Sequence, residues 1–213
     1  MGTRADARAR TTARILTAAR AEIAAHGGVG LSMRAVAREA GLVSSAVSRY
    51  YPTREALLTA MIIESYEHLA AALATVRARR PDRRWRALAE GMRGWAVANP
   101  HEFQLIYGTP IPGYAAPPET ISAAAAVARP FIDCVGAGDI PAFAGRRLTA
   151  QLVDAAEEFG TEPSALAAVL AELAALVGAV GLELAGHLVG TADPADHLFE
   201  AMVGRQIATL GLA

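Results

Sequence analysis

The 213-residue sequence contains no lysine, a single cysteine and few aromatic residues, which make up 6% of the chain. The lone Cys134 cannot form a disulfide within the chain, so we expect a reducing compartment. The N-terminus is rich in arginine and has no apolar core segment, so no signal peptide is predicted. A cytoplasmic protein is expected. The missing lysine carries no chemical conclusion, because a codon bias would produce it as well as selection would.

The residue patterns of common catalytic and cofactor sites are also missing. The sequence has no nucleophile–base pairing, no glycine-rich phosphate loop and no Cys/His spacing typical of a metal site. The most apolar run, residues 165–182, is interrupted by Glu172 and followed by Glu183, which favours a buried helix over a membrane span. We therefore expect no enzymatic activity, no cofactor, no metal and no membrane partner.

The sequence instead has the composition of a helical protein. Strand-type alternation is hard to find, and glycine and proline fall at punctuation points. The hydrophobic fraction is 53%, much of it alanine, which favours helix without requiring deep burial. An all-α fold is predicted.

Charge is divided unevenly along the chain. Residues 1–54 hold nine arginines against three acidic residues, a formal charge of +6, and the remainder has a formal charge of −7. This asymmetry is typical of a protein in which one end meets phosphate and the other does not.

Residues 31–58, LSMRAVAREAGLVSSAVSRYYPTREALL, carry the clearest local pattern. Ser32 can cap a short helix of regularly spaced apolar residues, and Gly41 follows where a left-handed residue usually ends a helix. A second short segment has Ser45, Ser48 and Arg49 on its outer side. Two short helices joined by a tight turn predict a helix-turn-helix, and small polar residues with one arginine suit the DNA major groove. The alternative is two amphipathic helices in a helical domain that does not bind nucleic acid.

This stretch resembles the TetR family of one-component transcriptional regulators. The matching residues are Ala40-Gly41, Ser44-Ser45, Tyr50-Tyr51, Thr53, Arg54, Glu55, Leu57 and Leu58. The resemblance implies a three-helix DNA-binding domain at residues 1–53 and a helical effector-binding and dimerisation domain at residues 54–213.

Two positions depart from the family pattern. Val43 stands where the family often has a serine cap, so we expect Ser44 or Ser45 to supply the cap. Ser48 stands where the family usually has a tyrosine that reaches a phosphate. Its side chain is shorter, so the sequence does not decide whether Ser48 makes the same contact. The C-terminal half also resembles, more faintly, the TetR subset named for a Trp-His-Gly motif.

The predicted DNA-binding residues lie in and around the helix-turn-helix. Ser45, Ser48 and Arg49 are expected to enter the major groove, and Arg34 and Arg54 to contact flanking phosphates. The full set is Ser32, Arg34, Ser44, Ser45, Ser48, Arg49, Tyr50, Thr53 and Arg54.

Elsewhere the apolar spacing, prolines and glycines predict further helices. Residues 1–9 are expected to form a disordered basic arm. The helix beginning at Thr53 is expected to reach Arg80 and to act as a lever between the two domains. The other expected helices are residues 10–26, 82–99, 101–107, 119–135, 141–160, 163–188 and a last one from 193.

A small-molecule pocket between the central helices is implied by the family resemblance, although aromatic residues at helical spacing also suit a plain core. The predicted ligand-binding residues are Trp95, His101, Phe103, Tyr107, Glu183 and His187. Glu183 and His187 are four residues apart on one expected helix face, which suits either two metal ligands or a hydrogen-bonded pair.

The last two helices are expected to form a two-fold dimer. The helix at residues 163–188 is apolar on nearly all sides, and a monomer would expose more apolar surface than a soluble chain usually does. The predicted interface residues are Leu173, Val177, Val180, Leu184, Phe199, Met202 and Val203.

Together these patterns predict a homodimeric transcriptional regulator, most simply a repressor. It would bind a near-palindromic operator in double-stranded DNA, and a small-molecule effector of unknown identity would release it. The alternative is a small all-α enzyme, or a carrier of lipids or small molecules, with an incidental helix-turn-helix. The charge asymmetry and the missing catalytic pattern argue against that alternative.

Overall fold

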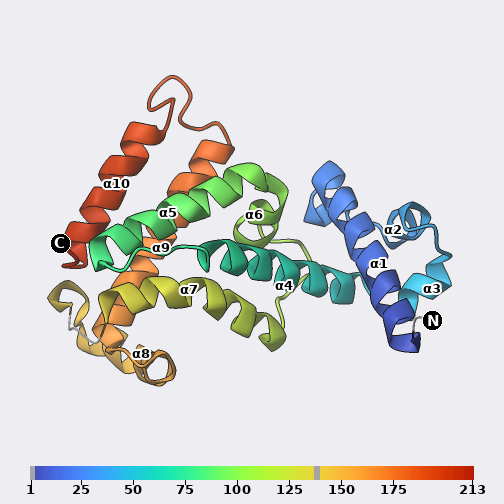
Figure 1. Ribbon diagram of the computed structural model, residues 1–213, viewed down its shortest axis with the longest axis horizontal. Coiled ribbons are helices and arrows are strands. Elements are labelled where there is room, and N and C mark those ends of the chain that lie inside the picture. Colours follow the sequence, from blue (N-terminus) through green and yellow to red (C-terminus); the bar gives the residue numbers. More distant parts are fainter. Residues whose placement is uncertain (1–2, 137–139) are drawn as a thin grey trace. The chain divides into compact units, whose positions relative to one another are not determined.

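The computed structural model describes residues 3–136 and 140–213, and throughout these ranges the regular elements are helices (Figure 1). The predicted all-α fold is confirmed. The chain divides into two compact units, Met1–Tyr66 with His101–Ser122, and Glu67–Pro100 with Ala123–Ala213. The first unit therefore extends past residue 53, because it includes part of the following helix and a later segment of the chain.

The first helix, α1 (Arg4–His26), begins earlier than predicted. The backbone amide of Thr3 donates to Asp6 Oδ2 at 2.6 Å, and the amide of Asp6 donates to Thr3 Oγ1 at 3.2 Å. This reciprocal pair is a capping box, which satisfies amides that a helix start leaves without partners. The prediction of a disordered arm is therefore wrong for residues 3–9, and residues 1–2 lie outside the described ranges.

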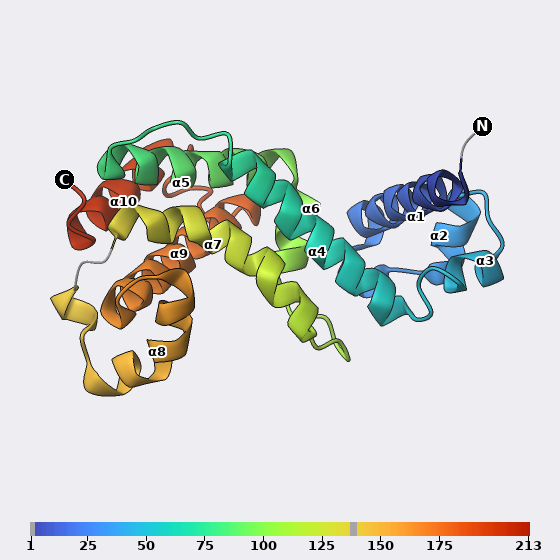
Figure 2. The ribbon, with the colours of Figure 1, turned by 60° about the horizontal axis from the view of Figure 1, so that its bottom comes forward.

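Two short helices follow, α2 (Met33–Glu39) and α3 (Ser44–Ser48). Gly41 lies in the turn between them with a φ of +63°, a conformation that glycine adopts without strain. Figure 2 shows α1 lying over both. Helices α1, α2 and α3 share one apolar core with the first turns of the next helix, α4. The fully buried residues of this core include Ile15, Ala19, Val36, Val47, Leu57 and Leu58. The predicted helix-turn-helix is thus present.

Helix α4 (Arg54–Leu73) begins as predicted but ends before Arg80. Thr53 Oγ1 accepts a hydrogen bond of 3.1 Å from the amide of Ala56, so the predicted cap is confirmed. The chain leaves the helix after Leu73, and Pro81 opens α5 (Pro81–Ala98) rather than closing α4. A proline suits a first helical turn because the amide it lacks has no partner there.

The chain continues through α6 (Pro100–Tyr107), which lies in the first unit apart from its first residue, and the loop that follows it. The remaining helices lie in the second unit, apart from the first two residues of α7. They are α7 (Ile121–Val135), α8 (Arg146–Phe159), α9 (Pro163–Leu184) and α10 (Asp196–Thr209). Short 3₁₀ turns occur at Gly28–Gly30, Pro118–Thr120 and Pro141–Phe143.

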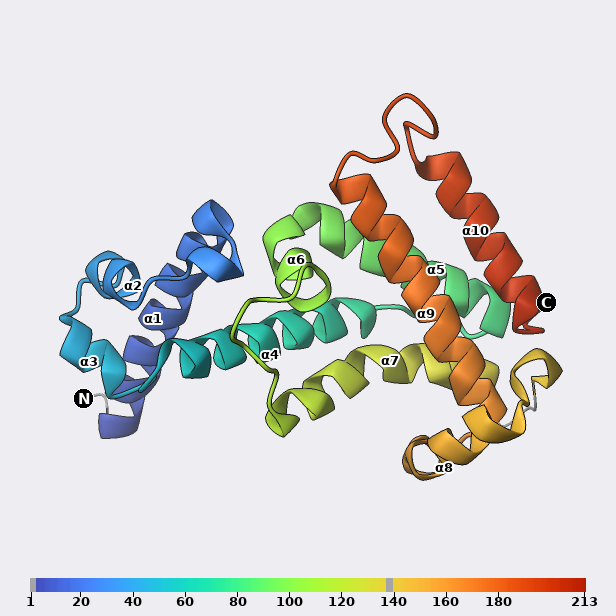
Figure 3. The ribbon, with the colours of Figure 1, turned by 180° about the vertical axis from the view of Figure 1, so that it is seen from behind.

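Helix α9 is the centre of the second unit. Helices α5, α8 and α10 all pack against it, and Figure 3 shows α10 running beside it. Its buried face includes Leu166, Leu176 and Val180. Helix α9 ends at Leu184, short of the predicted residue 188, because the chain turns there and Gly186 adopts a φ of +74°.

A chain of polar groups, buried except for Arg205, sets how α5, α9 and α10 align. Trp85 Nε1 donates to Gln206 Oε1 at 3.0 Å, and Gln206 Nε2 donates to the carbonyl of Glu172 at 2.8 Å. The Glu172 carboxylate accepts two hydrogen bonds from Arg205, at 3.0 and 3.3 Å. Since Gln206 has no exposed surface, sliding α10 along its neighbours would leave buried donors and acceptors without partners.

Helices α4 and α9 are long and apolar enough to cross a membrane, judged by length and composition only. Core helices of soluble proteins pass the same test, and both helices place fully buried leucines in the cores just described.

Candidate nucleic-acid interface

Helix α3 presents one polar face to solvent. Its five residues bury Val47 completely and leave Ser44, Ser45 and Ser48 exposed, together with the following Arg49. The side chains are small, so backbone and hydroxyl groups lie near the surface of the helix. This combination gives donors and acceptors for base edges with the slim profile that a major groove admits.

The cap of α3 differs from the prediction. Val43 occupies the N-cap position, and among the described residues no side chain caps the helix. Ser44 and Ser45 are the first residues inside the helix, so neither provides the cap. Ser48 Oγ donates to the carbonyl of Ser44 at 3.1 Å, and its lone pairs can still accept. Its contact with phosphate stays a prediction.

Arg54 has other partners than the phosphate predicted for it. Its Nε donates to the carbonyl of Leu31 at 3.0 Å, and one terminal nitrogen donates to the carbonyls of Gly28 and Val29 at 2.7 and 2.8 Å. A guanidinium carries several donors in a fixed fork, which suits three neighbouring carbonyls. Arg54 thus fastens the start of α4 to the connection between α1 and α2, a role that its position in the sequence did not reveal.

The other predicted DNA-binding residues divide into caps and exposed groups. Ser32 Oγ accepts from the amide of Ala35 at 3.4 Å, which confirms it as the cap of α2, and Thr53 caps α4. Arg34 is exposed on α2. Tyr50 is half-buried, with the guanidinium carbon of Arg8 lying 5.1 Å from the centre of its ring. Their contacts with DNA stay predictions.

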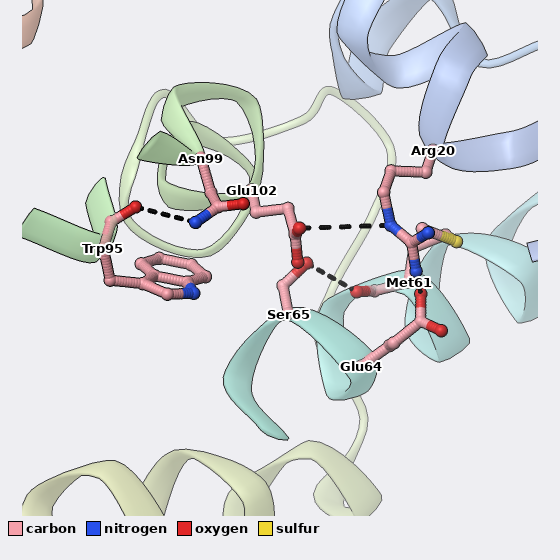
Figure 4. A network of polar contacts seen from close by, with 7 residues as sticks. All are labelled: Arg20, Met61, Glu64, Ser65, Trp95, Asn99 and Glu102. Carbon is pink, nitrogen blue, oxygen red and sulfur yellow. Dashed lines mark hydrogen bonds and ion pairs between the residues drawn. The ribbon is translucent and has the colours of Figure 1, made fainter. Parts of the chain in front are cut away.

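A charged network joins three helices of the first unit (Figure 4). Arg20 of α1 donates to Glu64 of α4 at 2.6 Å, and its Nε lies 3.9 Å from Glu102 Oε1 of α6. Glu102 is only 9% exposed. No local sequence pattern indicates this network, because its members are 44 and 38 residues apart along the chain.

The loop after α6 also packs against α4 and the connection between α1 and α2. The hydroxyls of Tyr114 and Thr59 lie 3.0 Å apart. Ile111 approaches Gly28 so closely that a Cβ on this glycine would lie 2.6 Å from Ile111 Cδ1. Residues 101–114, which we call the α6 segment, therefore form part of the first unit although they are distant in the sequence from its other residues.

Four of the six predicted ligand-binding residues, Trp95, His101, Phe103 and Tyr107, belong to different units. Trp95 is buried in the second unit. In the first unit Phe103 is buried, Tyr107 is half-buried and His101 is exposed. The ring of Tyr107 meets that of Tyr66 edge-on at 5.9 Å, and burial raises the pKa of both phenols. One pocket lined by all four residues stays a prediction.

Glu183 and His187 do not form a pair on one helix face. The Glu183 carboxylate accepts two hydrogen bonds from Arg93, both of 2.7 Å, whereas His187 lies beyond the end of α9 and is exposed. Arg93 also donates to Asp196 at 2.9 Å. These three charged groups border a cavity of about 140 Å³. In the described parts of the chain, no cluster of three or more metal-ligating side chains occurs.

The predicted dimer residues divide by burial. Val180, Phe199 and Val203 are 0%, 7% and 1% exposed, so they belong to the core of the second unit. The remaining four are half-buried: Leu173, Val177, Leu184 and Met202. The sequence could not separate the two groups, because α9 is apolar on nearly every side.

Comparisons with known proteins match both parts of the chain. The family described as bacterial regulatory proteins, tetR family, matches residues 15–61, and the family described as tetracyclin repressor-like, C-terminal domain, matches residues 85–206. The HTH-type transcriptional regulators Rv1816 of Mycobacterium tuberculosis and Mb1846 of Mycobacterium bovis are each 42% identical over 143 residues. That match spans 65% of this chain and 61% of each relative, which is less than two thirds of their length.

Solved structures agree with this assignment. The crystal structure of SCO4313, described as a regulatory protein, matches with a TM-score of 0.78 at 30% identity, over 97% of this chain and 100% of that one. A TetR-like transcriptional regulator from Rhodococcus sp. RHA1 has a TM-score of 0.58 at 18% identity over 98% of this chain and 99% of its own, a likeness of fold alone. The resemblance first carried by residues 40–58 is confirmed, and the chain belongs to the TetR family of DNA-binding transcriptional regulators.

Proposed function

We propose that this chain is a homodimeric cytoplasmic repressor that binds a near-palindromic operator in double-stranded DNA and leaves it when a small-molecule effector binds. The observation that carries the proposal is the exposed face of α3, where serines and Arg49 surround a helix anchored by the buried Val47. Family membership supports DNA binding, and ligand response and repression are typical of the family.

Charge supports the same surface. The nine arginines of residues 1–54 outnumber the acidic residues threefold. Arg4, Arg8 and Arg10 are exposed on the first turns of α1, and Arg34 and Arg38 are exposed on α2. Arginines neutralise phosphates and release counterions, which gives affinity for any DNA sequence and makes it depend on salt.

A dimer is supported by one face of α9. Leu170, Leu173, Val177 and Leu184 recur at helical spacing along it, and they are exposed or half-buried. Apart from neighbouring atoms of α9 itself, a Cβ added at Gly178 or Gly181 would meet no atom of the described residues within 4 Å, which leaves room for the close approach of another helix. In a two-fold dimer each α3 would meet one half-site, with the half-sites about 34–36 Å or a multiple of it apart.

Effector response needs a path into the DNA-binding unit. Helix α4 continues from the first unit into the second, and the α6 segment leaves the second unit to pack on the first. The Arg20 contacts with Glu64 and Glu102 tie both to α1. An effector that binds more tightly to an arrangement of α4 and α6 unable to bind DNA would shift the equilibrium towards that arrangement. The size of the shift equals the difference between its binding free energies for the two states.

The test is to identify DNA that the protein retains. Purified protein is mixed with sheared genomic DNA from its source, and the retained fragments are sequenced and used in binding titrations at several salt concentrations. We expect an enriched sequence with inverted half-sites and an affinity that falls linearly with salt on logarithmic axes. No enrichment, or an affinity that does not respond to salt, would overturn the proposal.

Arg49→Ala sharpens the test. If Arg49 contacts a guanine edge, its loss should cost about 1–3 kcal/mol on the operator and reduce the preference over unrelated DNA. Arg38→Ala is the matched control, since this exposed arginine of α2 should affect all sequences alike. Competition titrations with operator and unrelated duplexes distinguish the two, and the opposite pattern would show that α3 is not the reading helix.

A further inference from the structure

Val43 stands out at the start of α3. Three neighbouring helices of the first unit begin with a hydroxyl cap, from Thr3 for α1, Ser32 for α2 and Thr53 for α4. Helix α3 begins with Val43, which offers no side-chain hydrogen bond. Its side chain is also 69% exposed, so it contributes little to the core.

This residue is unfavourable on two independent local grounds. Valine is among the poor N-cap residues, where serine, threonine, aspartate and asparagine are favoured. An exposed valine also gains little from the hydrophobic effect. Local rules that are broken without a compensating contact inside the protein are expected at functional sites.

The position of Val43 indicates what it contacts. Val43 directly precedes the exposed Ser44 and Ser45 at the N-terminal end of α3. In a helix-turn-helix, the N-terminal residues of the recognition helix contact base edges. The apolar group that a base edge presents in the major groove is the 5-methyl of thymine. We propose that Val43 is a specificity-determining residue that packs against a thymine methyl in each operator half-site. This inference rests on the proposed DNA-binding function.

The surroundings of Val43 favour a single methyl group over a protein partner. Its exposed neighbours Gly41 and Ser44 offer no apolar side chain, and Leu42 is half-buried against the core of the unit. A protein partner would need a contiguous apolar patch of several hundred Å². A single exposed valine next to serines has the size and polarity to contact a single thymine methyl that is surrounded by polar base edges.

The experiment removes the methyl and the valine separately. The operator duplex from the fragment selection is synthesised with each thymine pair of the half-sites replaced in turn by deoxyuridine, which lacks only the methyl. Binding of each duplex is titrated for the wild type, Val43→Ala, Val43→Ser and Val29→Ala. Val29 is the matched control, because it is 63% exposed in the same unit but lies between α1 and α2.

We expect one thymine position at which replacement by uracil lowers the affinity of the wild type by about fourfold per half-site. This is the change in affinity expected from the loss of one buried methyl group. The same replacement should leave Val43→Ala and Val43→Ser unchanged, while Val29→Ala behaves like the wild type. Val43→Ser should also keep or raise the midpoint of thermal unfolding, since serine supplies the missing cap. A purely structural role would not make the effect of uracil depend on residue 43.

Two results would overturn the inference while leaving the proposed function intact. One is an operator for which no uracil replacement weakens the wild type. The other is a uracil effect of equal size in the wild type and in Val43→Ala. A chain that enriches no DNA at all would instead overturn the proposed function, and this inference with it.

Discussion

In the first unit, hydroxyl caps and Arg54 hold helix starts and connections in place, whereas in the second unit a buried chain of Trp85, Gln206 and Glu172 links long apolar helices. Thr3, Ser32 and Thr53 cap three helices, and Arg54 gathers three carbonyls of the α1–α2 connection. None of these contacts involves α3, whose residues Ser44 and Ser45 remain exposed together with Arg49.

The second unit relies on burial. Its central α9 contributes Leu166, Leu176 and Val180 to the core, and the fully buried Gln206 of α10 is hydrogen-bonded to Trp85 of α5 and Glu172 of α9. Burial of apolar surface supplies most of the stability of such a unit.

The difference predicts how each unit responds to substitution. The first unit adds many small polar contacts to its apolar core, so we expect the loss of one contact to loosen a helix start or a connection. The other unit has a core that responds to a substitution mainly through packing. The following substitutions test this contrast, beginning with the largest expected effect.

Val203→Arg should have the largest effect. Val203 is 1% exposed, and a buried arginine without a partner is expected to destabilise by several kcal/mol, about 3–5. Urea denaturation followed by circular dichroism should show a lower midpoint or an unfolded second unit. The matched variant is Val177→Arg on the half-buried face of α9, which should stay helical yet sediment as a monomer. If Val203→Arg instead folds normally and only dissociates, then α10 lies in the dimer interface rather than in the core.

Arg54→Ala should rank second. It removes three hydrogen bonds from a guanidinium to the carbonyls of Gly28, Val29 and Leu31, which together we expect to contribute about 2–3 kcal/mol. Thermal unfolding should show a lower midpoint, and the affinity for all DNA sequences should fall alike because the helix-turn-helix loosens. Normal stability with weaker DNA binding would instead favour a direct phosphate contact.

Arg20→Met should be milder. The substitution keeps most of the apolar stem but removes the cation beside Glu64, and about 1 kcal/mol is expected because a third of the arginine side chain is exposed and screened. Arg10→Met, on an exposed position of the same helix, is the control. Denaturation of both variants at low and high salt should show that only the Arg20 variant loses part of its salt-dependent stability.

Asp196→Asn should have the smallest effect. The hydrogen bond from Arg93 holds the pKa of the Asp196 carboxyl below its ordinary value of 3.8. A lowered pKa in the folded state stabilises the fold above pH 3.8, and this contribution is lost as the pH falls through the folded value. The variant should therefore match the wild type in strong acid and be slightly less stable near neutral pH. Unfolding midpoints measured from pH 2 to pH 7 check this, and a difference that grows towards low pH would contradict it.

Much of the first unit follows from the sequence alone, because its signals are local. Ser32, Gly41 and Thr53 act within one turn of where they stand, so these two caps and this turn were predictable, as was the exposed face of α3, whereas the caps of α1 and α3 were not. The end of α4 was not. Pro81 can close one helix or open the next, and only the structure shows that α4 stops at Leu73 and that Pro81 opens α5.

By itself, the sequence determined the helical class, the helix-turn-helix and the charge asymmetry, since each rests on neighbouring residues or on composition. Tertiary structure alone decided which apolar residues of α9 and α10 are core, because a helix that is apolar all round has no face marked for burial. Tertiary structure also decided the partners of long side chains. From the sequence, Arg54 could contact DNA or a backbone carbonyl, and the fold brings the carbonyl of Leu31 to it. Arg20 could face solvent or an acidic residue, and the fold brings Glu64 to it.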